Sequence, residues 1–350
     1  MESAARFNSA ESAKLSTMST SAPTASGPDS SDELHEVLEY AFEQARHDDS
    51  GDVADYIPEL AKANPDHFGF AVATAHGRLY QFGDAEKRFT IQSVSKAFTY
   101  CLALEVAGRA TVLRRVGVEP SGDAFNAIEF DPRTRRPYNP MVNAGAITVA
   151  ALLHNHLGAG AFDFMLDRFS RAAGRQLDVD DSVFRSESTT GHRNRAIGHL
   201  LVSVDAIHGN VDEICNLYFR QCSIRVTAVD LARMSMTMAN LGQNPVTQDQ
   251  VFEIPAVRDT QAVMFSCGMY DFSGTWAHRV GIPAKSGVGG GLMGVVNRQL
   301  GLGCYSPRLD GKGNPPRGVK VFTTLSEELG LHAFDCTRLG SSMLARFLNP

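Results

Sequence analysis

Strand-like segments near both ends of the chain, separated by a long helical stretch, constrain the fold more than any other feature. "FGFAVAT" and "RLYQFGD", on either side of "AHG", alternate apolar and other residues, which predicts a β-hairpin from about Phe68 to Phe82. After Ile282, "IPAKSGVGGGLMGVVNRQLGLGCYSP" indicates short strands with turns between them. This order predicts one sheet assembled from about 66–90 and 280–325 and covered by helices, with a helical subdomain inserted over about 105–275.

The segments around this sheet have patterns of their own. "ELHEVLEYAFEQARHD" carries apolar residues at helical spacing, and "GDVADYIPELAKANPD" predicts a second short helix. "TAVDLARMSMTMANLG" predicts a helix with Thr227 and Asp230 in a capping box, whereas "VKVFTTLSEELGL" fits a strand or a helix. Residues 1–32 are rich in Ser, Thr and Ala, which predicts a disordered tail and leaves 33–350 as the folded unit.

Composition and charge exclude several classes of function. The chain has 350 residues, 43% of them hydrophobic, and a net charge of −6 without a Lys/Arg block, so we expect no nucleic-acid partner. No apolar run reaches the roughly 20 residues that span a bilayer, and the N-terminus lacks a signal-peptide pattern, so we expect a cytoplasmic protein without a membrane partner. The six cysteines show no C-x-x-C spacing, which predicts neither disulfides nor structural zinc.

A serine and a lysine stand three residues apart in "FTIQSVSKAFTYCLALE", at the start of an apolar helix. Residues at this spacing share a helix face, so the Ser93 hydroxyl and the Lys96 amine could meet there. Lysine can act as the base that activates a serine if burial lowers its pKa from about 10.4. The motif alone is weak, because about 0.7 occurrences of S-x-x-K are expected by chance in a chain of this composition. Its meaning depends on the rest of the sequence.

A second lysine lies in "PAKSGVGGG", a strand-like segment with glycines after the lysine and serine. In serine acyl-enzymes that recognise penicillin, a K-[ST]-G strand lines the substrate channel and completes the oxyanion hole. A phosphate-binding loop needs its glycines before Lys-Ser, whereas here they follow, so we discount nucleotide binding.

Taken together, eight segments in order resemble the serine-dependent glutaminase family, which shares the fold of β-lactamases and D-Ala-D-Ala peptidases. They are "ADYIPELA", "FTIQSVSK", "EPSGDAFN", "NPMVNAGAI", "SESTTGHRN", "NLYFRQCSI", "MFSCGMYDFSG" and "PAKSGVGGG". The resemblance covers about 34–332. It implies a mixed α/β (α+β) fold of the β-lactamase/transpeptidase type, with a central antiparallel sheet flanked by helices and an inserted helical subdomain. It also makes 33–350 a glutaminase catalytic domain.

The resemblance implies roles for individual residues. Ser93 corresponds to the nucleophile, Lys96 to its general base, and Tyr56 and Tyr270 to tyrosines that take part in proton transfer. Lys285 is a possible supporting residue, which could orient the oxyanion strand or form a structural ion pair. The substrate-binding positions match at Ser93, Asn143, Glu187, Asn194, Tyr218, Tyr270 and Val288.

These residue types suit L-glutamine, the substrate that the family implies. A selective site needs one buried carboxylate for the α-ammonium group, which Glu187 can supply, and neutral donors for the α-carboxylate, which Asn143 and Asn194 can supply. After Ser93 attacks, backbone N–H groups of Ser93 and Val288 could hold the oxyanion. We expect no cofactor and no metal, because "HNH" at 154–156 has no carboxylate or cysteine at ligand spacing nearby.

Two other interpretations use the same fold. A β-lactamase or peptidase would share the Ser/Lys machinery, but the sequence lacks an export signal and an S-x-N triplet between the two motifs. A catalytically silent amino-acid-binding or filament-forming protein would be favoured by loss of Ser93, Lys96 or Tyr270, and all three are present. The amphipathic helices from Val211 to Leu241 predict self-association, as a homodimer or homotetramer.

Overall fold

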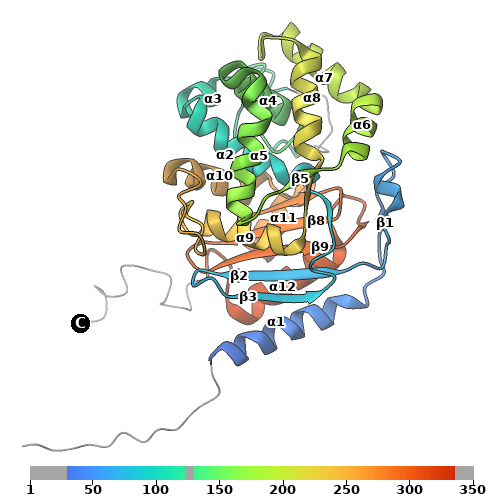
Figure 1. The fold of residues 1–350 in the computed structure, drawn as a ribbon, viewed down its shortest axis with the longest axis vertical. Helices are drawn as coiled ribbons and strands as arrows, with labels where there is room; N and C mark the ends of the chain where they lie inside the picture. The colour runs from blue at the N-terminus through green and yellow to red at the C-terminus, as the bar shows by residue number, and fades with distance from the viewer. Residues whose placement is uncertain (1–29, 123–129, 336–350) are drawn as a thin grey trace, which may run out of the picture.

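A five-stranded antiparallel sheet brings together the two ends of the folded chain. The computed structural model describes residues 30–122 and 130–335 (Figure 1). The strand order is β3-β2-β9-β8-β7, and every pairing in it is antiparallel. The strands are β2 (Gly69–Thr74), β3 (Leu79–Gly83), β7 (Ala284–Gly287), β8 (Gly291–Val296) and β9 (Leu300–Tyr305). The predicted central antiparallel sheet and the predicted hairpin at its start are therefore confirmed.

The two faces of the sheet support two separate hydrophobic cores. Phe70 and Val72 of β2 pack in one core with α1 (Ser30–Arg46) and α12 (Pro316–Leu329). The alternate residues of the same strand, Ala71 and Ala73, face the other core, which includes α9 (Ala228–Ala239). The period of two in β2 thus separates the layers, and Figure 1 shows α1 and α12 on the side of the sheet opposite to α9.

Glycines on β9 let α9 approach the sheet closely. A Cβ atom at Gly301 would overlap the carbonyl oxygen of Ala232, and one at Gly303 would overlap that of Ala228. The glycine-rich composition of this strand is therefore a packing requirement between backbone and backbone.

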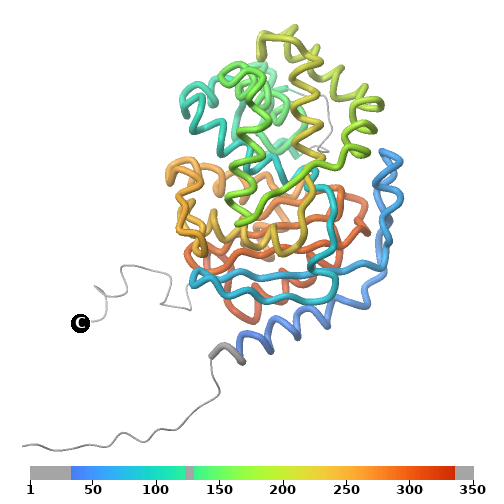
Figure 2. Tube along the Cα trace, viewed as in Figure 1, coloured from blue at the N-terminus to red at the C-terminus, as the bar shows by residue number. Residues whose placement is uncertain are grey.

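The middle of the chain is helical, and its helices lie together above α9 in Figure 1, where Figure 2 shows the same path as a trace. Its elements are α2 (Ser95–Val106), α3 (Arg109–Arg115), α4 (Asn143–Leu157), η3 (Gly158–Gly160), α5 (Ala161–Ala173), α6 (Asp181–Thr190), α7 (His192–Ser203) and α8 (Val211–Cys222). A small three-stranded sheet links this part to the rest, with the order β4 (Phe89–Thr90), β6 (Ile224–Val226) and β5 (Asp178–Val179). After α9 come α10 (Ile254–Cys267), η4 (Tyr270–Phe272) and α11 (Ser273–Arg279).

The predictions for three local segments can be compared with the structure. The capping box at the start of α9 is confirmed, with the Asp230 N–H bonded to Thr227 Oγ1 at 3.1 Å and the Thr227 N–H bonded to Asp230 Oδ2 at 2.8 Å. Of the two alternatives for "VKVFTTLSEELGL", the helix is correct, as α12. The predicted tail over 1–32 lies outside the described residues, apart from its last three positions, where α1 already begins.

The second short helix predicted in "GDVADYIPELAKANPD" is wrong. The segment contains β1 (Asp52–Val53), which pairs with β10 (Arg308–Leu309), and a single 3₁₀ turn, η1 (Leu60–Lys62). Pairing with a strand more than 250 residues later extends the backbone, which a local pattern cannot reveal. As a result, residues 54–59 form an irregular segment that carries Tyr56.

None of the helices in residues 30–122 and 130–335 has both the length and the apolar character needed to cross a bilayer.

Candidate active site

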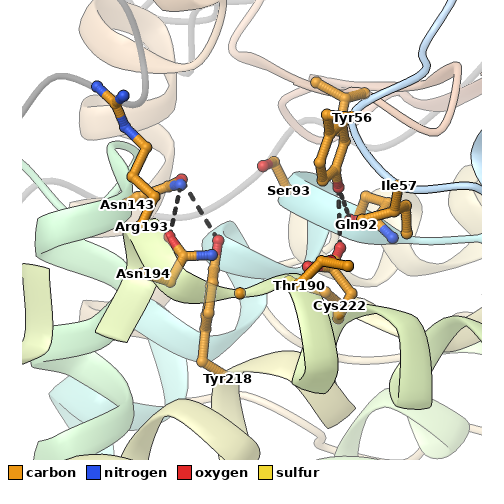
Figure 3. Close-up of a pocket in the computed structure, with 13 residues that line it drawn as sticks. Tyr56, Ile57, Gln92, Ser93, Asn143, Thr190, Arg193, Asn194, Tyr218 and Cys222 are labelled. Carbon is orange, nitrogen blue, oxygen red and sulfur yellow. Dashed lines mark hydrogen bonds between the residues drawn. The ribbon is translucent and has the colours of Figure 1, made fainter. Parts of the chain in front are cut away.

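A pocket of about 280 Å³ opens between the helical part of the chain and the segments around β4 and β7 (Figure 3). Seven of the residues singled out in the sequence line it: Tyr56, Ser93, Asn143, Glu187, Asn194, Tyr218 and Val288. The lining also includes Ile57, Gln92, Thr190, Gly191, Arg193 and Cys222. The other three predicted residues, Lys96, Tyr270 and Lys285, are buried and do not line this pocket.

Ser93 lies in the 3₁₀ turn η2 (Gln92–Val94), between the end of β4 and the start of α2. The residue is 5% exposed and borders the pocket. Gln92, directly before it, has a backbone φ of +47°, a left-handed conformation that is rare for a residue with a long side chain. The turn thus presents Ser93 at the head of a buried helix through a strained backbone.

Lys96 is buried and forms no ion pair with a carboxylate among the described residues. Its Nζ donates to Asn143 Oδ1 at 2.6 Å and to the Met141 carbonyl oxygen at 3.3 Å. Burial lowers the pKa of the Lys96 amine to about 8, an effect that the negative charge of Glu187 opposes. The amine therefore loses its proton far more easily than a lysine in water does.

Asn143 connects Lys96 to the helical wall of the pocket. It is the first residue of α4, and its Nδ2 donates to Asn194 Oδ1 at 3.0 Å. The Tyr218 hydroxyl donates to Asn143 Oδ1 at 3.4 Å. Figure 3 shows these three side chains on the side of the pocket opposite to Tyr56.

Glu187 provides a carboxylate inside the pocket. It is 4% exposed, and within the described part of the chain no Lys, Arg or His side chain forms an ion pair with it. Burial raises the pKa of Glu187, while hydrogen bonds from Tyr56 and Gln92 and the charge of Lys96 lower it. The site therefore holds a desolvated acid that a cationic ligand group would stabilise in its charged form.

Tyr56 reaches this carboxylate from the irregular segment 54–59. Half of the residue is exposed, yet its hydroxyl points into the pocket and lies 2.9 Å from Glu187 Oε1 and 2.9 Å from Gln92 Oε1. Desolvation of that hydroxyl raises the pKa of Tyr56 well above its usual value, so the phenol stays protonated and can donate.

Tyr270 and Lys285 meet at β7, behind Ser93. The Tyr270 hydroxyl donates to the Ser286 carbonyl oxygen at 2.9 Å, and it also lies within hydrogen-bonding reach of the Ser93 side chain. Lys285 Nζ donates to the same Ser286 oxygen at 2.6 Å and to the Gly268 oxygen at 3.1 Å. Lys285 forms no ion pair with any described residue, so the ion-pair alternative for it is not observed.

Six of the residues that line the pocket were not singled out in the sequence, and two of them, Gln92 and Cys222, bear on its chemistry. Gln92 contacts Tyr56, and its position next to Ser93 is the one signal that could have indicated it. Cys222 lines the pocket from the end of α8, where burial raises the pKa of its thiol to about 12. No group of three or more His, Cys, Asp or Glu side chains within 30–122 and 130–335 is arranged to hold a metal ion.

In sequence and in overall structure, the chain resembles proteins of one family. A sequence model of the family described as Glutaminase matches residues 51–334. A glutaminase from Nostoc sp. is 52% identical over 294 residues, which cover 83% of this chain and 87% of that protein. The solved structure of a probable glutaminase, ybaS, superposes with a TM-score of 0.81 at 35% identity and covers 87% of this chain and 98% of its own.

Another solved structure, of Mglu in its glutamate form, gives a TM-score of 0.82 at 41% identity and covers 87% of this chain and 71% of its own. The matched region includes every residue discussed for the pocket, from Tyr56 to Val288. On sequence and on structure, the chain belongs to the glutaminase family.

Proposed function

We propose that this protein hydrolyses the side-chain amide of L-glutamine to L-glutamate and ammonia, through an ester formed with Ser93. The observation that carries the proposal is one pocket that Ser93, at the head of α2, shares with a buried carboxylate, Glu187, which has no cationic partner among the described residues. Family membership and the glutamate-bound form of Mglu support the same substrate class.

Substrate binding uses the contrast between the two walls of the pocket. The α-ammonium group pairs with Glu187, whose charged form gains a partner only when a cation enters. Asn143, Asn194 and Tyr218 offer neutral donors to the α-carboxylate. The side-chain amide then points towards Ser93, which lines the same pocket.

Acylation begins with the neutral amine of Lys96, which takes the proton of the Ser93 hydroxyl as Oγ attacks the amide carbon. The carbonyl oxygen becomes an oxyanion, which the backbone N–H groups of Ser93 and Val288 stabilise. The C–N bond breaks when the proton passes from Lys96 to the leaving nitrogen, with the protonated hydroxyls of Tyr270 and Tyr56 available for the transfer.

Deacylation repeats the same proton movements with water. Lys96, neutral again once ammonia has left, accepts a proton from a water molecule that attacks the glutamyl ester. The second oxyanion collapses, Ser93 recovers its proton, and glutamate leaves. No cofactor takes part in these steps.

The test is ammonia release from L-glutamine by the wild type and by Ser93→Ala, with asparagine and nitrocefin as parallel substrates. We expect the wild type to hydrolyse glutamine and Ser93→Ala to be inactive. Asparagine, which is one methylene shorter, should be hydrolysed slowly, because one methylene gives about 1–3 kcal/mol of discrimination, and nitrocefin should not be hydrolysed. Ser235→Ala is the matched control, because Ser235 is a fully buried serine of α9 that donates to the Leu302 carbonyl far from the pocket.

Retained glutamine hydrolysis in Ser93→Ala would refute the serine ester. Turnover of nitrocefin alone would favour the β-lactamase interpretation, and the absence of any turnover would favour the silent binding protein.

A further inference from the structure

The peptide group between Gln92 and Ser93 has its two ends in different surroundings. Its N–H belongs to Ser93, and its carbonyl belongs to Gln92. Because a trans peptide is planar, with C=O and N–H pointing in opposite directions, whatever fixes the Gln92 oxygen also fixes the direction of the Ser93 N–H. The strained φ of +47° at Gln92 means that this direction is not the one the backbone would adopt alone.

Two donors from Ser95 hold the Gln92 oxygen. The backbone N–H of Ser95 bonds to it as part of the 3₁₀ turn, and Ser95 Oγ donates to it at 2.6 Å. Ser95 is fully buried. Both bonds therefore form away from water, where hydrogen bonds are stronger.

Gln221 orients the Ser95 hydroxyl. Its Nε2 donates to Ser95 Oγ at 3.0 Å from the last turn of α8, the helix that also carries Tyr218. A hydroxyl has a single proton, and the Gln92 carbonyl can only accept, so Ser95 gives its proton to Gln92 and accepts one from Gln221. The chain of bonds thus has a fixed direction, from Gln221 through Ser95 to the Gln92–Ser93 peptide.

Stability does not explain the presence of a glutamine at this place. Gln221 is fully buried, and its Oε1 has no hydrogen-bond partner among the described residues. A buried acceptor without a donor destabilises a fold, whereas an apolar side chain of the same volume would not. What glutamine adds here is its donor to Ser95.

We propose that Ser95 and Gln221 are positioning residues, which hold the Gln92–Ser93 peptide plane so that the Ser93 N–H points at the developing oxyanion. The inference rests on the proposed acyl-enzyme function and extends it to two residues that line no part of the pocket. A donor that is misdirected at the oxyanion weakens stabilisation of the transition state but leaves binding of the ground state nearly unchanged.

The experiment measures kcat and KM for glutamine in Ser95→Ala, Ser95→Cys, Gln221→Met and the double variant Ser95→Ala/Gln221→Met. We expect kcat to fall about tenfold in Ser95→Ala with KM within about twofold of the wild type. The kcat of Ser95→Cys should lie between those of the wild type and Ser95→Ala, because a thiol is a weaker donor than a hydroxyl. Since Gln221 acts through Ser95, the double variant matches Ser95→Ala rather than the product of the single effects.

The matched control is again Ser235→Ala, which removes a fully buried hydroxyl bonded to a carbonyl of β9 instead of to the Gln92 carbonyl. We expect it to lower thermal stability as much as Ser95→Ala does, while kcat stays at the wild-type value. If Ser95→Ala fails to fold, Ser95→Cys and Gln221→Met still decide the question.

Three results would overturn the inference: unchanged kcat in the Ser95 variants, a change confined to KM, or additive effects in the double variant. Each is distinct from failure of the proposed function, which would appear as a wild type without ammonia release or as an active Ser93→Ala.

Discussion

Two lysines among the described residues are almost completely buried, and they differ in the groups that accept their hydrogen bonds. Lys96 is 1% exposed and Lys285 is 0% exposed, and neither forms an ion pair within residues 30–122 and 130–335. Lys96 donates to the side chain of Asn143, a residue that lines the pocket, and to one carbonyl. Lys285 donates only to backbone carbonyls, those of Gly268 and Ser286.

Burial lowers the pKa of both amines, to about 8 for Lys96 and well below its usual value for Lys285. The face of the Tyr270 ring, 4.2 Å from Lys285 Nζ, favours an ammonium there, whereas burial favours the neutral amine. The two hydrogen bonds of Lys285 join two backbone segments, at Gly268 and at Ser286. Lys96 is thus suited to gain and lose a proton, and Lys285 to hold the backbone.

Removal of the Lys96 amine tests this contrast most severely. We expect Lys96→Met to lower kcat by about 10³-fold, since general bases contribute 10²–10⁴-fold. Lys96→Arg should be equally impaired, because a guanidinium does not lose its proton. Steady-state ammonia release measures both. An active Lys96→Arg would show that the position supplies only positive charge, and the contrast with Lys285 would be lost.

The next effect is on stability. The pKa of Lys96 is lower in the folded protein than in the unfolded chain, so between about pH 8 and 10.5 the unfolded chain binds more protons. The free energy of unfolding of the wild type, relative to Lys96→Met, should therefore rise by roughly 2 kcal/mol from pH 7 to 9.5. Urea unfolding of both proteins measures the difference, in which the titration of other groups cancels. A difference that does not vary with pH would mean that Lys96 keeps its usual pKa.

A smaller effect is expected on the rate of the wild type. Lys96 acts as a base only when neutral, so kcat at saturating glutamine should rise about fivefold from pH 7 to 8, as the amine with a pKa of about 8 loses its proton. Lys285→Met should keep the same pH profile, because that lysine is not the titrating base. A pH profile that shifts in Lys285→Met would show that Lys285, and not Lys96, is the titrating base.

The smallest effect is expected for the activity of Lys285→Met. Both carbonyls keep another donor, since Tyr270 bonds to Ser286 O and the Ser286 N–H bonds to Gly268 O. We therefore expect kcat to fall only about threefold, through slight displacement of the Tyr270 hydroxyl. Kinetics of this variant beside Lys96→Met give the ratio of the two effects. A loss as large as that of Lys96→Met would place Lys285 among the proton-transfer groups.

Features formed within a few residues of sequence were predictable. The β2–β3 hairpin and the capping box at Thr227 and Asp230 follow from turn and cap chemistry. The gathering of the pocket residues did not follow from such patterns but from the resemblance to a family, because the bond from Lys96 to Asn143 joins positions 47 residues apart.

What remained hidden depends on contacts distant in the chain. The false helix at 51–65 arises because Asp52 and Val53 pair with β10. The left-handed backbone at Gln92 and its support from Gln221 have no local signal, since nothing in "TIQSVSK" requires a positive φ. The cytoplasmic location and the homodimer or homotetramer stay predictions.

The position of β2 between β3 and β9 has a consequence for synthesis of the chain. On the ribosome the β2–β3 hairpin is complete soon after residue 83. The other edge of β2, however, has no partner until residues 300–305 of β9 emerge. At the usual 5–20 residues per second, that interval is roughly 10 to 45 s. Throughout it, an apolar strand edge is open to other nascent chains. The yield of active protein should therefore depend on translation speed and on chaperones that cover this edge.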